Sequence, residues 1–127
     1  GWNGVKDERG RRLLQELGTV GRNYDSDIWI RFVFDKISKE RSERVVITDC
    51  RYVNEFVETA GFARDSGYEF LPLHVVRPGA GLAGPSGEHE SERECENMPA
   101  VMVRNDGTVE ELYAKIDFLM ERILEQA

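Results

Sequence analysis

A carboxylate and an arginine stand two residues apart directly after a run of β-branched residues. Val45-Val46-Ile47-Thr48 precedes Asp49, and Arg51 follows it. A carboxylate at the end of a strand can hold a metal-bound water beside a phosphate, and an arginine can donate a fork of hydrogen bonds to phosphate oxygens. The same residues could instead serve the fold, with Asp49 capping the next helix or pairing with Arg51. The pattern therefore leaves a phosphate site and a structural pair as alternatives.

A glycine-rich stretch follows Arg77 and matches a nucleotide-binding pattern only in its letters. Residues 79–84 fit G-x-G-x-x-G. In dinucleotide-binding folds that pattern turns directly into a helix whose N-terminus meets the pyrophosphate, whereas Pro85-Ser86-Gly87 prolongs the loop here. The composition favours a flexible, lid-like loop over residues 77–96 rather than a dinucleotide site.

The remaining candidates give little support to metal or nucleophile chemistry. The acidic run 88–96 contains His89 and Cys95, but zinc prefers well-spaced nitrogen and sulfur ligands on a rigid frame. We interpret the run as a solvated acidic helix face or a mobile segment. His74 falls within an apolar run, which is typical of a hydrogen-bonded core histidine. Two histidines do not supply a persuasive Ser/His/Asp triad.

Charge narrows the class of ligand. The formal net charge is −7, and polynucleotide-binding proteins usually present a basic face, so nucleic acid is not expected as a partner. Residues 1–51 hold 11 basic and 9 acidic side chains, whereas residues 52–127 hold 6 and 15. A small anion such as a mononucleotide could be held by arginines of the first part. The alternative is that these arginines only make helix faces soluble.

Length and composition indicate one soluble domain over residues 1–127. The apolar runs fall short of the ~20 residues that span a bilayer, so no membrane contact is expected. Two cysteines, Cys50 and Cys95, do not make a disulfide framework. A reduced, cytoplasmic protein is the simplest interpretation.

Hydrophobic periodicity predicts the elements that must position these residues. Apolar positions recur at helical spacing in four segments, namely residues 7–17, 26–41, 53–66 and 108 to the end. Gly18 and Gly67 are expected to end the first and third helices. Apolar runs predict strands at residues 44–49, 68–76 and 100–104, before a turn at 105–107. Thr108 and Glu111 form a capping-box pattern, and the inward stripe of the last helix is expected to be Val109, Leu112, Tyr113, Ile116, Leu119 and Ile123.

The alternation of strands and helices predicts an α/β fold with a mainly parallel sheet and right-handed crossovers. In such sheets ligands bind beyond the carboxyl ends of the strands. Three strands are fewer than the usual five or so, and the first strand of the pattern is expected to be missing.

Taken together, the motifs resemble bacteriophage-type deoxynucleoside monophosphate kinases of the P-loop class. The resemblance runs in order along the whole chain. Its segments are Trp2 to Thr19 with Gly21-Arg22 and Trp29, Val45 to Glu55, Arg77-Pro78-Gly79 with His89-x-Ser91-Glu92, and Asn105-Asp106-Gly107-Thr108-x-x-Glu111-Leu112.

The resemblance implies a three-layer P-loop kinase-like sandwich that moves the γ-phosphate of ATP, with Mg²⁺, to a deoxynucleoside monophosphate (dNMP). Arg11, Gln15, Arg22 and Trp29 would shape the monophosphate site. Asp49 would be the Walker-B-like carboxylate near the metal, Arg51 a phosphate contact and Arg77 a lid cation. Asn105, Asp106, Gly107 and Thr108 would flank the adenine. A phage-encoded or bacterial protein is implied.

The chain departs from the family pattern at one point. It does not contain G-x-x-x-x-G-K-[ST], whose backbone amides and lysine cradle the donor phosphates. We therefore expect a fragment, a chain whose N-terminus was lost or lies elsewhere, or a degenerate relative, inactive on its own. A non-catalytic nucleotide-binding module and an interaction domain that pairs through an exposed sheet edge, as in a homo-oligomer, are the alternatives.

Overall fold

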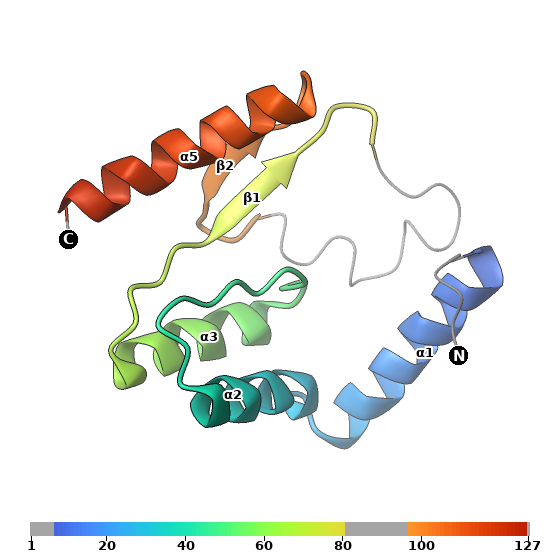
Figure 1. Ribbon diagram of the computed structural model, residues 1–127. Helices are drawn as coiled ribbons and strands as arrows, with labels where there is room; N and C mark the ends of the chain where they lie inside the picture. Colours follow the sequence, from blue (N-terminus) through green and yellow to red (C-terminus); the bar gives the residue numbers. More distant parts are fainter. Residues whose placement is uncertain (1–6, 81–96, 127) are drawn as a thin grey trace. The chain divides into compact units, whose positions relative to one another are not determined.

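The computed structural model describes residues 7–80 and 97–126 and divides into two compact units. The first comprises residues 7–70 with 97–98, and the second residues 71–80 with 99–126. Each unit is described by itself. The described residues form four helices and a two-stranded parallel sheet, which confirms the α/β class (Figure 1). The single-domain prediction for residues 1–127 stays a prediction.

Several sequence expectations lie outside the described residues. They are the end of the glycine pattern from residue 81 onward, most of the expected lid and the acidic run with His89 and Cys95. Within the described ranges, no helix is both long and apolar enough to cross a membrane.

Helix α1 runs from Glu8 to Tyr24. The carboxylate of Asp7 accepts a hydrogen bond from the backbone N–H of Gly10 at 2.7 Å, which caps the first turn. The expectation that the helix stops at Gly18 was wrong. A glycine inside a helix costs only about 1 kcal/mol, so packing against neighbouring side chains can outweigh it.

Helix α2 spans Ile28–Glu40, within the predicted range, and packs on α1 through Trp29. The indole N–H of Trp29 donates to the carbonyl of Gly18 at 3.1 Å. A Cβ atom added to Gly21 would lie 2.4 Å from the Trp29 ring, so only glycine admits the indole here. The close approach of the two helices explains the glycine at position 21 of α1.

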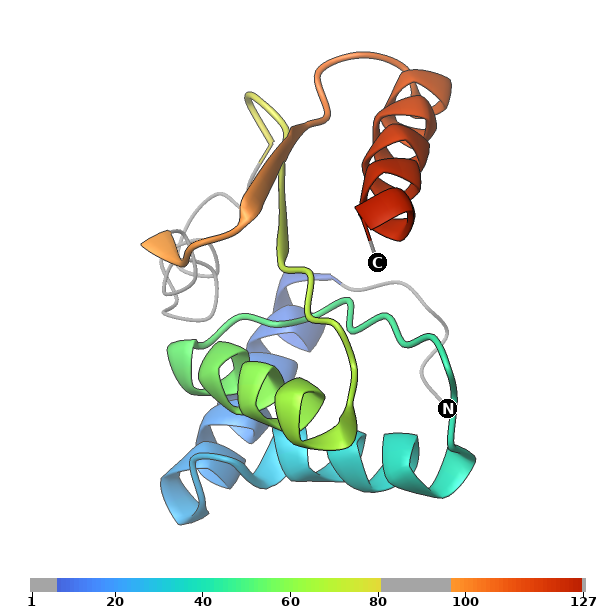
Figure 2. The ribbon, with the colours of Figure 1, turned by 90° about the vertical axis from the view of Figure 1, so that its left-hand side faces the viewer.

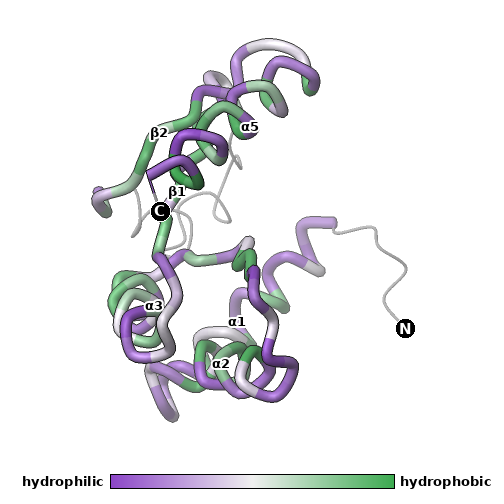
Figure 3. Tube along the Cα trace, turned by 60° about the vertical axis from the view of Figure 1, so that its left-hand side comes forward, coloured by the Kyte–Doolittle hydropathy of each residue, from purple (hydrophilic) through white to green (hydrophobic). Residues whose placement is uncertain are grey.

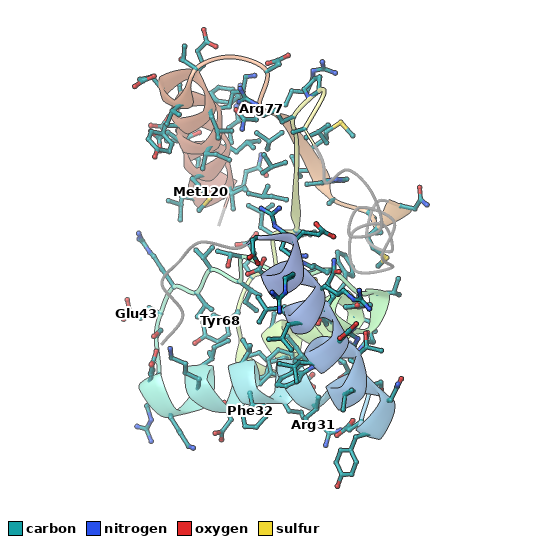
Figure 4. The ribbon with its side chains drawn as sticks, turned by 90° about the vertical axis from the view of Figure 1, so that its right-hand side faces the viewer. Arg31, Phe32, Glu43, Tyr68, Arg77 and Met120 are labelled. Carbon is teal, nitrogen blue, oxygen red and sulfur yellow. The ribbon has the colours of Figure 1, made fainter. Side chains whose placement is uncertain are left out.

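Helix α3 spans Val53–Ser66, as predicted, and ends at Gly67, whose φ of 78° is in the left-handed region. It packs beside α2, and Figure 2 shows the two helices side by side. The rings of Phe34 and Phe62 stack with their centroids 4.3 Å apart. The hydroxyl of Tyr68, labelled in Figure 4, donates to the carbonyl of Ser42.

The segment at residues 44–49 is not a strand, and that prediction was wrong. It forms no β-ladder, and Val46 is 85% exposed. A preference for β structure is mostly a fit to a pleated, half-buried surface, so it needs a neighbouring strand. The described part of the first unit supplies no such neighbour for this segment.

The second unit is built on strands β1 (Leu73–Val76) and β2 (Val101–Arg104), which pair in parallel. Leu73 lies opposite Val101, and Val76 lies opposite Arg104. The predicted strand at 68–76 is therefore shorter at its start, whereas that at 100–104 is confirmed to within a residue. Both strands carry hydrophobic residues in Figure 3.

Helix α5 (Val109–Gln126) packs on β2. Its predicted capping box is confirmed, because Thr108 Oγ1 accepts from Glu111 N at 3.2 Å and Glu111 Oε2 accepts from Thr108 N at 3.0 Å. The expected inward stripe is half-buried at Leu112, Ile116, Leu119 and Ile123. Val109 and Tyr113 are exposed, so the stripe is narrower than predicted.

Two glycine substitutions separate packing from helix propensity. Gly21→Ala should destabilise the fold by about 1–3 kcal/mol, because the new methyl group overlaps the Trp29 ring. Gly61→Ala, inside α3 with nothing within 4 Å of its added Cβ, should instead stabilise by up to about 1 kcal/mol. Urea denaturation of both variants measures the free energies of unfolding, and equal effects would contradict the close α1–α2 approach.

Candidate functional site

Three neutral groups, from Tyr52, Thr19 and Gly18, lie next to the guanidinium of Arg22, and we call them the Arg22 seat. The central carbon of the guanidinium lies 4.0 Å from the centroid of the Tyr52 ring, and its Nη2 donates to Thr19 Oγ1 at 3.2 Å. Its third neighbour is Gly18, where an added Cβ would lie 3.0 Å from Nη1. Among the described residues, no carboxylate lies within ion-pair distance of Arg22. Within the described part of the chain, the positive charge is therefore oriented without being neutralised.

The other predicted monophosphate residues of α1 lie on the same side of the helix as Arg22. Arg11, Gln15, Gly18 and Arg22 are spaced by four, three and four residues, which places them on one face. The side chains of Arg11, Gln15 and Arg22 are half-buried. The α1 helix thus collects two guanidinium groups and an amide along one stripe.

Trp29 lies beside this stripe but has a clear structural function. Its single hydrogen-bond donor is taken by the Gly18 carbonyl, and its ring packs on Gly21. The indole remains 41% exposed. Trp29 and Arg22 thus lie close together, because the side chains of both are next to Gly18.

Asp49 and Arg51 form an ion pair, with Arg51 Nη2 and Asp49 Oδ1 3.4 Å apart. Asp49 does not cap α3, because Glu55 does so: its Oε2 accepts from Arg51 N at 2.8 Å and from Tyr52 N at 3.1 Å. The side chains of Asp49 and Arg51 are 77% and 45% exposed. An exposed pair of this kind contributes little to stability and can exchange its partners for a ligand.

Two further predicted residues meet in the second unit. Arg77 follows β1 and Asn105 follows β2, so the parallel register brings both to the carboxyl ends of the strands. Arg77 Nη1 donates to Asn105 Oδ1 at 3.3 Å, and Arg77 is labelled in Figure 4. Because an arginine can only donate, the Asn105 oxygen faces it and the amide NH₂ is directed elsewhere.

The turn after β2 is held by its own charged neighbours. Asp106 accepts from Arg104 Nε at 3.1 Å and from Lys115 Nζ at 3.2 Å, and Lys115 also donates to the Arg104 carbonyl at 2.6 Å. These hydrogen bonds, first from Arg104 and then from Lys115, hold the pKa of Asp106 below its usual 3.8. The local packing also explains why residue 107 is a glycine, since an added Cβ would overlap the Glu111 carboxylate in its present position.

Two hollows of the first unit lie away from these residues. An open hollow of about 660 Å³ is lined by residues of α2 and α3 including Phe34, Phe56 and Phe62, and a smaller one by residues around Phe32. None of the predicted site residues lines either hollow. The described residues also contain no cluster of three or more metal-ligating side chains, so Asp49 is a single carboxylate.

Sequence reasoning gave no function to Tyr52, Thr19 or Lys115. Tyr52 could have been noticed, because it directly follows Arg51 and precedes a helix. Thr19 contacts Gln15 and Arg22, four residues before it and three after it on the same helix, and these contacts were missed because the helix was expected to stop at Gly18. The contacts of Lys115 depend on the course of the turn after β2, and the sequence gives no sign of them.

A family model described as deoxynucleotide monophosphate kinase matches residues 5–116. The chain belongs to the deoxynucleotide monophosphate kinase family. The match includes every predicted site residue, from Arg11 to Thr108. Both the Arg22 seat and the strand ends of the second unit are therefore parts of a family sequence.

Two relatives show the extent of the similarity. The chain is 31% identical over 130 residues to the deoxynucleotide monophosphate kinase of Enterobacteria phage T4. This alignment covers 90% of the present chain and 46% of the phage protein. The chain is 28% identical over 111 residues to the uncharacterized protein ORF77 of Ictalurid herpesvirus 1 (strain Auburn), covering 83% and 45%. The chain thus spans about half the length of these relatives. No solved structure gives a significant match.

The charge network of Asp106 predicts a pH dependence. Because the folded-state pKa is lowered, the interactions of the carboxylate stabilise the fold above the unfolded-state value near 3.8 and are lost as the pH falls through the folded value. Lys115→Met should move the pKa of Asp106 back toward 3.8, since it removes one hydrogen-bond donor and one positive charge. Carboxyl chemical shifts followed by NMR between pH 2 and pH 6 measure this, and an unchanged titration would contradict the network.

Proposed function

We propose that the first unit binds the monophosphate group of a dNMP on Arg22. One observation carries the proposal: the Arg22 guanidinium is held by a ring, a hydroxyl and a glycine, with no carboxylate in ion-pair range among the described residues. A guanidinium has five donors in a planar fork that suits phosphate oxygens. In a chain with a net charge of −7, a cation kept apart from carboxylates is a local site for an anion.

In this proposal, residues near Arg22 on α1 and those at the start of α2 and α3 would make further contacts with the nucleotide. Arg11 and Gln15 share the α1 face of Arg22 and would contact the same nucleotide. Trp29 would form a wall beside the phosphate. Arg51, whose partner Asp49 is exposed, would make a further phosphate contact. Affinity would come from several charge-assisted hydrogen bonds, each stronger than a neutral one.

The whole protein is proposed to be a P-loop kinase-like enzyme of three layers that transfers the γ-phosphate of ATP to the dNMP. Mg²⁺ usually takes one or two carboxylates together with water and substrate phosphates, so the single exposed carboxylate of Asp49 fits it. When bound, the ion would neutralise charge on the phosphates. Asp49 would hold it, and Arg77 would be a lid cation.

Base recognition is proposed for the turn of the second unit. Asp106, Gly107 and Thr108 already bond with or pack against Arg104, Lys115 and Glu111, so they would shape the turn that flanks the adenine. Asn105 presents its amide NH₂ because its oxygen accepts from Arg77. The amide would donate to a ring nitrogen of the base.

Residues 1–127 alone are proposed to bind nucleotide without transferring phosphate. The relatives are about twice as long, and the pattern G-x-x-x-x-G-K-[ST] does not occur in these residues. Because phosphoryl transfer depends on positioning the donor phosphates, ATP and a dNMP should yield no ADP with this chain. A coupled ADP assay together with calorimetry tests this, and steady ADP formation would contradict it.

A second candidate function is assembly through the sheet. The sheet order β1–β2 gives each strand only one bonded neighbour within the described residues. Unpaired strand edges pair readily with another chain, so a homo-oligomer joined at this edge is proposed as an alternative. Light scattering over a hundredfold concentration range should then show growing mass, and a monomer throughout would exclude this candidate.

Removing the Arg22 side chain tests the main proposal. Arg22→Ala should weaken dNMP binding by about 1.5–3 kcal/mol, since a hydrogen-bonded charged contact is lost. Affinity for the matching deoxynucleoside, which has no phosphate, should stay unchanged. Isothermal titration calorimetry measures both constants.

Arg12→Ala is the matched control. Arg12 lies on the same helix, its side chain is 76% exposed and it pairs with Glu16. Its loss should leave dNMP affinity as in the unaltered chain. An Arg22→Ala variant that binds dNMP normally would show that the phosphate lies elsewhere.

A further inference from the structure

We infer that Gly18 and Tyr52 are positioning residues for the phosphate-binding arginine, an inference that rests on the proposed function. Neither residue need touch the nucleotide. Together with Thr19 they fix the direction of the Arg22 guanidinium before any ligand arrives.

Tyr52 is a rigid support. Its side chain is buried, with the residue only 5% exposed, and its ring lies under the Arg22 guanidinium. Its backbone N–H donates to Glu55, which fixes it at the start of α3. Two residues later, the Asn54 amide donates to the Ser26 carbonyl and to Asp27 Oδ1, both at 2.8 Å. The start of α3, which carries Tyr52, is therefore tied to the start of α2.

Gly18 leaves space beside the guanidinium. A Cβ atom at this position would lie 3.0 Å from Arg22 Nη1 and 3.7 Å from Nη2. A carbon at the shorter distance is tighter than an ordinary contact, so the guanidinium would have to shift by a few tenths of an ångström. The absence of a side chain at Gly18 lets the planar group lie against the helix on which it is carried.

Thr19 completes the seat and is itself oriented. Its hydroxyl donates to the Gln15 carbonyl at 2.9 Å, so its oxygen is directed to accept from Arg22 Nη2 at 3.2 Å. All three groups are uncharged. They restrict the rotamers of Arg22 while leaving its charge available, so less side-chain freedom is lost when an anion binds.

The test compares two alanine substitutions at helical glycines. Gly18→Ala raises helix propensity, so the chain should fold, yet its methyl group would crowd the Arg22 guanidinium and shift it by a few tenths of an ångström from its place on the Tyr52 ring. We expect dNMP affinity to fall roughly two- to tenfold, the range set by ordering one long side chain. Gly61→Ala, with open space at its added Cβ, is the matched control and should bind as the unaltered chain does.

A second pair of variants tests the ring. Tyr52→Phe keeps the aromatic face and should keep dNMP affinity, whereas Tyr52→Leu removes the face and should lose a similar factor. In NMR spectra without ligand, the ring should shift the Arg22 side-chain proton signals upfield in the unaltered chain and in Tyr52→Phe, but not in Tyr52→Leu. A purely structural residue would not link this signature to affinity for the phosphate group.

The outcomes separate the two proposals. Calorimetry with a dNMP, its deoxynucleoside and inorganic phosphate is run on each variant, with thermal melting as the check of folding. If the unaltered chain binds dNMP and Gly18→Ala binds equally well, the positioning inference is overturned while the proposed function stands. If the unaltered chain binds no dNMP, both are overturned. Should Tyr52→Leu fail to fold, the result with Gly18→Ala decides.

Discussion

The Arg22 guanidinium lies 4.0 Å from the centre of the Tyr52 ring, and this contact joins α1 to the start of α3. A cation on an aromatic face keeps its full charge, because the attraction comes from the ring quadrupole rather than from a counter-ion. The contact can therefore hold elements together and leave a site for an anion. An arginine paired with a carboxylate could do the first but would offer less to a phosphate.

Two glycines in the interior of α1 leave room for the side chains that pack on this helix. Gly18 gives space to Arg22 and its carbonyl to Trp29, while Gly21 admits the Trp29 ring. Each glycine lowers the intrinsic stability of the helix. A larger residue at position 21 would overlap the Trp29 ring, and one at position 18 would crowd Arg22. The packing of the helices and the proposed binding of phosphate therefore both rely on glycines of α1.

The second unit uses a different principle, in which the parallel register of β1 and β2 brings together side chains 28 positions apart. Arg77 and Asn105 meet at the ends of the strands, and Lys115 of α5 secures the turn through Asp106 and the Arg104 carbonyl. Hydrogen bonds within the turn leave few of its polar groups free to move. Both this turn and the Arg22 seat fall within residues 5–116, which match the deoxynucleotide monophosphate kinase family.

The sequence alone determined the α/β class, helices α2, α3 and α5, the Gly67 stop and the Thr108–Glu111 cap, because these depend on periodicity and on contacts within a few residues. It also identified the family. Only the tertiary structure decided that α1 continues through Gly18, that residues 44–49 find no strand partner among the described residues and that Tyr52 supports Arg22. Those outcomes depend on what packs against each segment from distant parts of the chain, which local residue preferences do not encode.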